Sequence, residues 1–259
     1  MLGAIIGDVV GSVYEARPIK TKDFPLLGPG STFTDDTVCT VAVADWLMGG
    51  GGEEPAAALR RWCRRYPGAG YGGMFYRWIM TDGMPGYGSW GNGAAMRVSP
   101  CGWLAASLEE ALAAAERATN VSHDHPEAVR GAQAVAAAVW WAREGREPED
   151  VRRQVAERFG YDLRPTVDEV RPGYGFDVSC AGTVPPALIS ALTAEGFEDA
   201  VRNAVSLGGD ADTLACIAGA VAEPLFGVPD ALAEVVAPRL GDDIRATLAR
   251  FAARTRGAG

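Results

Sequence analysis

The stretch from residue 128 to residue 145, AVRGAQAVAAAVWWAREG, is nearly all apolar. It predicts a long helix that is central and buried, because a helix that is apolar on most sides cannot face water. Such a helix needs other elements to cover it. The chain has no convincing segment in which apolar and polar residues alternate, so strands are not expected to supply that cover. We therefore predict an all-α fold, a compact multi-helix bundle.

Other helices are indicated by the residues at their starts. Residues 53–66 have two acids and Pro55 in the first turn, and Ser107 with Glu110 forms the pattern of a capping box ahead of residues 108–119. Further helices are expected at residues 35–48, 148–160, 183–196, 197–209, 212–227 and 241–254. The irregular stretch 160–180 has some strand-like character but is too short to mark a domain boundary. A single domain over residues 1–259 is predicted.

The N-terminal segment carries glycine at four-residue spacing, as Gly3, Gly7 and Gly11. Residues four apart lie on one face of a helix, and a glycine face lets a neighbouring helix approach closely. In a chain without a membrane span, this spacing indicates close helix packing inside the bundle.

The chain is acidic, with a net charge of −9 and a pI of about 4.8. A broad nucleic-acid surface or an anionic membrane as partner is therefore not expected. A small anionic ligand would need local attraction from metal ions, backbone N–H groups or a few arginines.

The five cysteines are scattered and form no C-x-x-C pair, which is typical of buried, reduced thiols in a cytosolic protein. The first fifteen residues lack the basic region of a signal peptide, and Asp8 interrupts their apolar run. We expect a cytoplasmic location, no membrane partner and a monomer.

Two predicted helices begin with clusters of oxygen donors. Thr34, Asp35 and Asp36 precede one apolar run, and Asp210, Asp212 and Thr213 follow a double glycine and precede another. Helix capping explains one such residue at each start, but not three.

Taken singly, each cluster fits capping better than metal binding. If the two helix starts face each other, however, their like charges require cations between them. Oxygen donors without His or Cys suit Mg²⁺ first, then Mn²⁺ or Ca²⁺, and disfavour zinc. Facing helix starts of this kind would therefore hold divalent cations between them, Mg²⁺ first.

A glycine turn and a histidine pair offer two further candidate sites. Residues 88–97, GSWGNGAAMR, place Gly91, Asn92 and Gly93 before a helical stretch, a turn whose N–H groups suit a phosphate. His123 and His125 stand ahead of the apolar helix. One interpretation is that Asp124 simply caps that helix, and the alternative is an imidazole that contacts a ligand. Metal binding by the two histidines is a third interpretation, and it is less favoured because no further nitrogen or sulfur ligands accompany them.

Two acidic residues, Asp8 and Glu15, lie in the N-terminal segment. Asp8 lies among isoleucine and valine and should therefore be paired, either to a backbone N–H or to groups that support the site. Glu15 ends the glycine-spaced helix and is by itself an ordinary glutamate at a helix end.

Five segments of the chain, in this order, resemble the ADP-ribosylglycohydrolase family. They are GAIIGDVVGSVYE, FTDDT, GNGAAMR, SHDHPEAVRGAQAVA and SLGGDADTLACIAGAVAEPLFG, from residue 3 to residue 227. The pairing of TDDT with GGDADT is the most specific element. The resemblance implies an all-α enzyme with two Mg²⁺ (or Mn²⁺) at the base of a cleft. It implies cleavage of the bond between ADP-ribose and a modified side chain of a protein, or another adduct.

The resemblance also implies roles for single residues. Metal ligands fall on Thr34, Asp35, Asp36, Asp210, Asp212 and Thr213, and catalytic roles on Glu15, Asp36 and Asp212. Substrate-binding positions fall on Ser89, Trp90, Gly91, Asn92, Gly93 and His123. Arginine-specific members place an acid just ahead of the Gly-Asn pair, where this chain has Ser89 and Trp90, so the linkage stays open.

Two other functions stay open beside the glycohydrolase. One is a non-catalytic protein that binds ADP-ribose, and the other is a dinuclear-metal phosphoesterase that acts on a small nucleotide. The product separates the three: free ADP-ribose, no product, or AMP.

Overall fold

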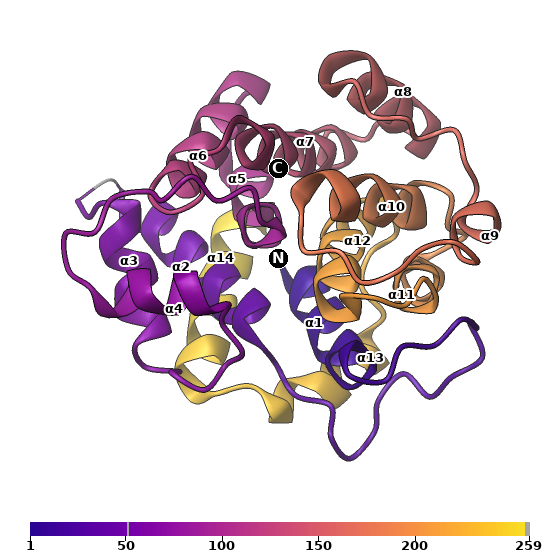
Figure 1. Cartoon of the computed structure of the whole chain (residues 1–259), viewed down its shortest axis with the longest axis horizontal. Coiled ribbons are helices and arrows are strands. Elements are labelled where there is room, and N and C mark those ends of the chain that lie inside the picture. Colours follow the sequence, from indigo (N-terminus) through magenta and orange to yellow (C-terminus); the bar gives the residue numbers. More distant parts are fainter. Residues whose placement is uncertain (51, 257–259) are drawn as a thin grey trace.

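Two helices that are far apart in the sequence lie side by side in the middle of the molecule (Figure 1). In the computed structural model, which describes residues 1–50 and 52–256, α1 (Leu2–Glu15) packs along α12 (Ala211–Phe226). A Cβ atom at any of the three glycines of α1 would come within 3.0 Å of the α12 backbone. The facing pairs are Gly3 with Gly219, Gly7 with Ala215, and Gly11 with Ala211. The glycine repeat is therefore a packing face, as expected.

The remaining helices surround this pair. They are α2 (Asp35–Met48), α3 (Pro55–Cys63), α4 (Gly73–Met80), α5 (Ser99–Leu104), α6 (Leu108–Asn120), α7 (Pro126–Arg143), α8 (Pro148–Phe159), α9 (Val167–Val170), α10 (Cys180–Leu192), α11 (Phe197–Ser206), α13 (Asp230–Val236) and α14 (Asp242–Arg256). Two 3-10 turns, η1 (Asn92–Ala94) and η2 (Ala237–Arg239), join them. The described residues form no β-sheet, and Gly91 makes an isolated antiparallel bridge with Ser179. The predicted all-α fold is confirmed.

The apolar segment that predicted a buried helix forms α7. It packs against α5, α6, α8, α10 and α12, and most of its side chains are buried. Its start differs from the expected one. His125, rather than Asp124, caps the helix by accepting a hydrogen bond from the Glu127 N–H at 3.2 Å. Asp124 instead accepts a hydrogen bond from the Gly88 N–H at 2.6 Å.

Some local expectations need correction. Helix α3 ends at Cys63 rather than at residue 66, and α4, α5 and α13 form where no helix was predicted. Ser107 caps α6 by accepting from the Glu110 N–H at 3.2 Å, but the Glu110 carboxylate bonds the Ala106 N–H, so only half of a capping box forms. The irregular stretch 160–180 contains the short α9, which has a complete capping box of its own.

The segment that follows Glu15 is tied by one lysine to residues 171–174 and to the residue that follows α11. The Lys20 ammonium donates hydrogen bonds to the carbonyl oxygens of Arg171 at 2.9 Å and Tyr174 at 2.6 Å, and to that of Leu207. Leu207 directly precedes the double glycine that leads into α12. Lys20 therefore links the end of α1 to the start of α12.

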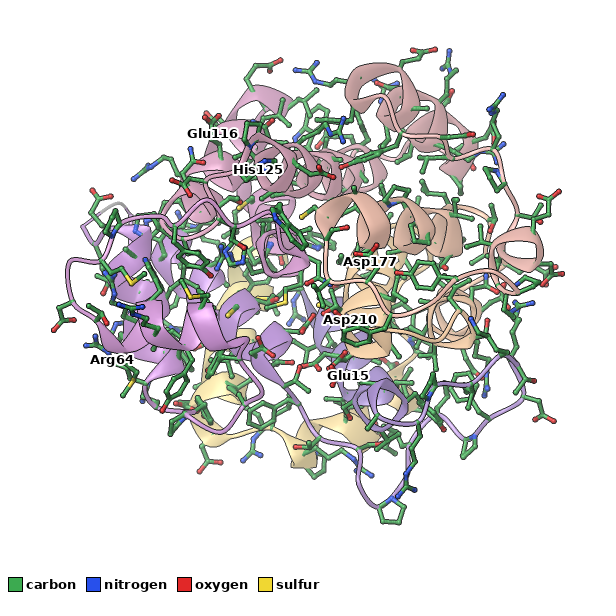
Figure 2. All side chains as sticks on the ribbon, viewed as in Figure 1. Glu15, Arg64, Glu116, His125, Asp177 and Asp210 are labelled. Atoms are coloured by element: carbon green, nitrogen blue, oxygen red, sulfur yellow. The ribbon has the colours of Figure 1, made fainter. Side chains whose placement is uncertain are left out.

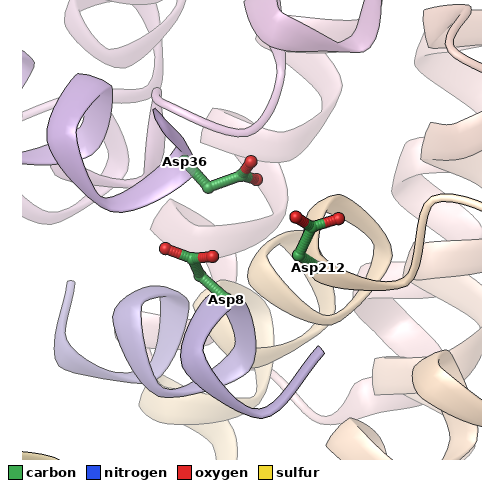
Figure 3. A group of neighbouring side chains, drawn as sticks. All are labelled: Asp8, Asp36 and Asp212. Carbon is green, nitrogen blue, oxygen red and sulfur yellow. The ribbon is translucent and has the colours of Figure 1, made fainter. Parts of the chain in front are cut away.

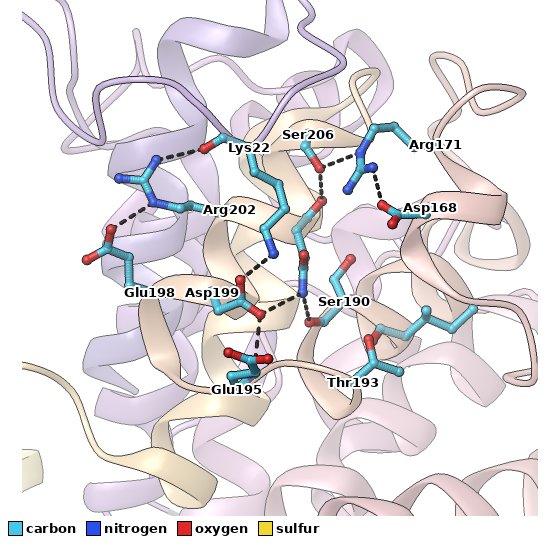
Figure 4. Close-up of polar contacts among 12 residues, drawn as sticks. Lys22, Asp168, Arg171, Ser190, Thr193, Glu195, Glu198, Asp199, Arg202 and Ser206 are labelled. Atoms are coloured by element: carbon cyan, nitrogen blue, oxygen red, sulfur yellow. Dashed lines mark hydrogen bonds and ion pairs between the residues drawn. The ribbon is translucent and has the colours of Figure 1, made fainter.

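A second set of contacts fastens the same segment to α11 (Figure 4). Lys22 forms an ion pair with Asp199, and Arg202 donates to the carbonyl oxygens of Lys22 at 2.9 Å and Phe24 at 2.7 Å. Glu198 accepts a hydrogen bond from Arg202 at 2.7 Å and so fixes the guanidinium. Together with Lys20, these contacts hold residues 20–24 on the body of the molecule.

Two other observations concern the rest of the chain. All five cysteines are free and buried, as expected. Within the part of the chain that the structure describes, no helix combines the length and apolar character needed to cross a lipid bilayer.

We predict that Gly7→Ala lowers the free energy of unfolding by about 3 kcal/mol, the upper range for overpacking. Alanine is the better helix former by about 1 kcal/mol, so helix propensity alone predicts the opposite sign. The matched control is Gly68→Ala, because a Cβ at Gly68 has no atom within 4 Å. Urea unfolding of both variants measures the difference, and equal stabilities would contradict the close α1–α12 contact.

Candidate active site

Two acidic helix starts meet at the base of one cleft. Helix α2 begins after Thr34 and α12 begins after Asp210, and the cleft between them has a volume of about 640 Å³. All the residues selected from the sequence as catalytic, metal-binding or substrate-binding line this cleft. They are Glu15, Thr34, Asp35, Asp36, Ser89, Trp90, Gly91, Asn92, Gly93, His123, Asp210, Asp212 and Thr213.

Three buried carboxylates lie close together on three helices (Figure 3), and those of Asp36 and Asp212 line the cleft. Asp8 from α1, Asp36 from α2 and Asp212 from α12 each place an oxygen within 4.8 Å of the other two. Glu15, Asp210 and Asp212 form a second group under the same limit, so Asp212 belongs to both. Figure 2 shows Glu15 and Asp210 together near the centre of the molecule. The two groups form one acidic cluster that runs from the buried base to the exposed Glu15.

Asp8 is the support for the start of α2. It is completely buried and accepts hydrogen bonds from the N–H groups of Thr34 at 2.9 Å and Thr37 at 3.1 Å. The hydroxyl groups of the same two threonines also donate to its carboxylate, that of Thr34 at 2.7 Å. Asp8 is therefore paired as expected, and it fixes the position from which α2 presents Asp36.

The start of α12 is shaped by two glycines and an asparagine. Gly208 and Gly209 have φ values of 72° and 77°, in the left-handed region that favours glycine. The Asn92 side chain donates to Asp210 at 2.7 Å and to Thr183 at 3.1 Å. Asp210 makes no side-chain cap to its own helix, because Asn92 directs its carboxylate into the cleft. Capping therefore does not explain this residue.

Capping explains one residue at the start of α2. Thr34 accepts a hydrogen bond from the Asp36 N–H, which is the role of a helix cap. Asp36 and Asp35 have no such role. The Thr213 hydroxyl donates to Asp36 at 3.3 Å, so a threonine from each helix start contacts the same carboxylate.

The carboxylates of this cluster and that of the neighbouring Asp35 are hard to ionise together. Burial, followed by the charges of Asp8 and Asp35, raises the pKa of Asp36 well above its ordinary value, and burial with the charge of Asp36 does the same for the pKa of Asp212. Burial and the charge of Asp8 raise the pKa of Asp35 to about 7. The pKa of Glu15 is raised by partial burial and by Asp210. Like charges at short range in a poorly solvated site are the common cause.

The donor set fits divalent cations. Among the described residues, no lysine or arginine forms an ion pair with Asp8, Asp36 or Asp212. The Oδ1 atom of Asp36 is buried without a hydrogen-bond partner, which is costly for a carboxylate oxygen. Carboxylate and hydroxyl oxygens are the ligands that Mg²⁺ and Mn²⁺ accept. A cation beside Asp36 would satisfy the free oxygen and reduce the repulsion.

The glycine turn forms one wall of the cleft, but most of its donors are already used. The Gly91 N–H donates to the Ser89 hydroxyl at 3.2 Å, and the Asn92 N–H donates to the Val178 carbonyl at 2.8 Å. The 3-10 turn η1 (Asn92–Ala94) overlaps the glycine turn, and the next helix, α5, begins only at Ser99. Within residues 91–93, the Gly93 N–H is therefore the donor that can serve a ligand. Trp90 also lines the cleft, with 49% of its surface exposed.

His123 lies against the same turn. Its ring is 5% exposed and borders the cleft, and a Cβ atom at Gly93 would lie 3.1 Å from its Nε2 atom. His125 faces away from this chemistry as the cap of α7 and does not line the cleft. The two histidines therefore do not act as a pair.

Comparison with known proteins agrees with this geometry. A family profile described as ADP-ribosylglycohydrolase matches residues 1–259. The chain belongs to the ADP-ribosylglycohydrolase family. It is accordingly a hydrolase of the glycosidase type.

Relatives of several kinds are similar to this family member. "ADP-ribosylarginine hydrolase Tri1" of Pseudomonas putida is 28% identical over 88% of this chain and 70% of its own length. "ADP-ribosylhydrolase ARH3" of Homo sapiens is 24% identical over 88% of this chain and 84% of its own. A solved structure titled "ADP-ribosylglycohydrolase-related protein complex" superposes with a TM-score of 0.73 at 26% identity, covering 98% of this chain and 96% of the other. The fold and the family thus agree.

Several lining residues of this ADP-ribosylglycohydrolase-family cleft were not found from the sequence. Met74 and Phe75 come from α4, Tyr87 precedes the glycine turn, and Phe176 and Val178 come from the irregular stretch 171–179. Phe176 is 63% exposed. A large aromatic residue between Gly175 and Asp177, in a stretch without a helix pattern, is the sequence signal that could have selected this segment.

We predict that Asp212→Asn changes stability with opposite sign in the absence and presence of Mg²⁺. Without Mg²⁺, removal of one repelling charge should raise the free energy of unfolding by about 1 kcal/mol. In the unsubstituted protein, Mg²⁺ at about 100 times its dissociation constant should add about 2.7 kcal/mol, and the variant should lose that gain.

Thermal unfolding in EDTA and in Mg²⁺ measures both effects. The matched control is Asp82→Asn, which removes an exposed carboxylate from a surface ion pair with Arg64. Equal responses to Mg²⁺ in the two variants would contradict a cation site at Asp212.

Proposed function

We propose that this protein hydrolyses the bond between ADP-ribose and a modified protein side chain in a Mg²⁺-dependent reaction and releases free ADP-ribose. One observation carries the proposal: acidic residues from the starts of α2 and α12 converge in a single cleft, next to a free carboxylate oxygen and a glycine turn. Family membership and the named activities of the relatives support the same reaction. Mn²⁺ is the alternative cation.

In this proposal, two cations are held at the base of the cleft by six residues from the two helix starts: Thr34, Asp35, Asp36, Asp210, Asp212 and Thr213. Bound divalent cations orient oxygen ligands and lower the pKa of water toward neutrality. Asp8 does not need to contact a cation, because Thr34 and Thr37 already occupy its carboxylate. Its role is to keep Thr34 and the first turn of α2 in place.

The reaction breaks the bond from the anomeric carbon of the ribose to the side-chain atom and forms a bond from that carbon to a water oxygen. Positive charge develops on the sugar during this exchange, and the acidic cluster stabilises it. Glu15 lies at the exposed edge of the cluster, and its pKa is raised by partial burial and by Asp210. It can give a proton to the leaving side chain or accept one from water.

The wall of the cleft that contains the glycine turn would bind the part of ADP-ribose that lies beyond the reacting ribose. The Gly93 N–H and the His123 ring face a position for oxygen atoms of the diphosphate, and Trp90 borders it with an exposed ring. These groups position the sugar over the acidic base, and positioning of this kind can supply several orders of magnitude in rate.

The test is incubation with Mg²⁺ and either ADP-ribosylated protein or ADP-ribosylated DNA, followed by identification of the product. Arginine-linked and serine-linked proteins are both used, because the linkage is open. Free ADP-ribose supports the proposal. AMP would identify a phosphoesterase, and tight binding of ADP-ribose without any product would identify a binding protein. Asp212→Ala should abolish both Mg²⁺ binding by calorimetry and ADP-ribose release, whereas full activity in EDTA would overturn the proposal.

We predict that Glu15→Gln lowers turnover about 100-fold, the usual size of a lost proton transfer. Affinity for ADP-ribose should stay nearly unchanged, because the amide keeps the shape of the side chain. Single-turnover kinetics and calorimetry separate the two quantities. A large loss of affinity with normal turnover would make Glu15 a binding residue instead.

A further inference from the structure

Arg97 is a buried cation without an anionic partner. Its side chain is completely buried, and the ion pairs among the described residues do not include it. Its Nε and Nη1 atoms have no hydrogen-bond partner. The guanidinium lies over the Phe75 ring with 5.4 Å to the centroid. Burial of an unpaired charge is expensive, so this arrangement needs a reason.

The polar contacts of Arg97 lead directly to His123. Its Nη2 atom lies 2.9 Å from the Ser122 hydroxyl oxygen and 3.2 Å from the Nδ1 atom of His123. The Ser122 oxygen is also 2.8 Å from the same Nδ1. A guanidinium can only donate hydrogen bonds, so the Nδ1 atom that faces it must accept. The Ser122 hydroxyl accepts from Arg97 and donates to the same ring nitrogen.

A neutral imidazole with an accepting Nδ1 carries its proton on Nε2. That atom faces the glycine turn, because Cβ atoms at Gly93 and Gly91 would lie 3.1 and 3.6 Å from it. The glycines leave this space open to the cleft, which His123 lines. The ring therefore presents a fixed N–H donor at the wall of the cleft.

We propose that Arg97 is a positioning residue that, with Ser122, holds His123 as the neutral tautomer with hydrogen on Nε2, ready to bind an acceptor oxygen of the ligand. The identity of that ligand as ADP-ribose rests on the proposed function, whereas the tautomer does not. Arg97 acts through His123 and does not touch the ligand.

The charges around His123 support a neutral ring. Burial and the positive charge of Arg97 lower the pKa of His123 well below its ordinary value. The other groups that face the ring or adjoin it are Tyr87, whose ring centroid is 5.7 Å away, Phe75, and Asp124, whose carboxylate bonds the Gly88 N–H. Burial and Arg97 both lower this pKa, burial more than Arg97. His123 therefore donates a hydrogen bond without acting as an acid or base.

Nitrogen NMR of the histidine side chains in the free protein tests the tautomer. The chain has two histidines, and His125→Asn assigns their signals while keeping a residue that can cap α7. We expect His123 to show an accepting Nδ1 and a protonated Nε2, without titration between about pH 5.5 and 8, around the ordinary histidine pKa of about 6.5. A proton on Nδ1, or a charged ring at neutral pH, would overturn the proposal with no variant needed.

Arg97→Met removes the charge and the donor and leaves an apolar side chain that buried sites accept. His123 should then titrate at a higher pH than in the unsubstituted protein, because the repelling charge is gone. Calorimetry should show at least about tenfold weaker binding of ADP-ribose, the loss expected for a misdirected hydrogen bond to a charged group.

Arg143→Met is the matched control, because Arg143 donates to the carbonyls of Trp103 and Ala105 away from the cleft. The Arg143→Met variant should leave both the titration of His123 and the affinity for ADP-ribose unchanged. If Arg97→Met does not fold, Ser122→Ala removes the other donor to Nδ1, and an unchanged His123 tautomer and ADP-ribose affinity in that variant would count against the proposal. A folded Arg97→Met with unchanged His123 titration and ADP-ribose affinity would refute the role of Arg97. Failure of the unsubstituted protein to bind ADP-ribose would instead refute the proposed function and leave the tautomer result intact.

Discussion

The backbone contact between α1 and α12 determines where the carboxylates of the cleft lie. A Cβ atom at Gly11 would come within 3.0 Å of Ala211 and Asp212, the residues that begin α12. Asp8 and Glu15 stand on either side of Gly11 along α1. The contact that requires glycine therefore also brings both ends of the acidic cluster against Asp212. A larger side chain in this face would separate the helices and spread the charges.

The cost of this arrangement is electrostatic. Burial and mutual repulsion raise the pKa of Asp36 and Asp212, so the ionised cluster destabilises the protein unless a cation joins it. Asp8 limits the cost for its own charge by accepting four hydrogen bonds from Thr34 and Thr37. Asp36 keeps one oxygen without a partner. The carboxylate that is satisfied supports the site, and the one that is not satisfied is available for binding.

Sequence patterns predicted the elements that local rules decide. The apolar run predicted α7, and the oxygen donors at two helix starts predicted residues that line the cleft. Asp8, which lies among apolar residues in the sequence, was predicted to be paired. Contacts between distant segments were beyond such rules. Asn92 was assigned to a phosphate turn, yet its side chain directs Asp210, 118 positions further along the chain. The cap of α7 is His125 and not Asp124, because the Asp124 carboxylate accepts a hydrogen bond from the Gly88 N–H. Local capping preferences do not reveal such a contact with a distant residue.

An anionic ligand in an acidic protein needs attraction that the net charge of −9 does not provide. The glycine turn supplies less than its sequence suggests, since the N–H groups of Gly91 and Asn92 already have partners. A neutral N–H donor on His123 meets part of this need. The charge that keeps the ring in this state lies on the completely buried Arg97, which forms no ion pair within the described part of the chain. In the proposed function, the base of the cleft would hold cations and its wall would hold an anion, because the two sets of groups do not pair with each other.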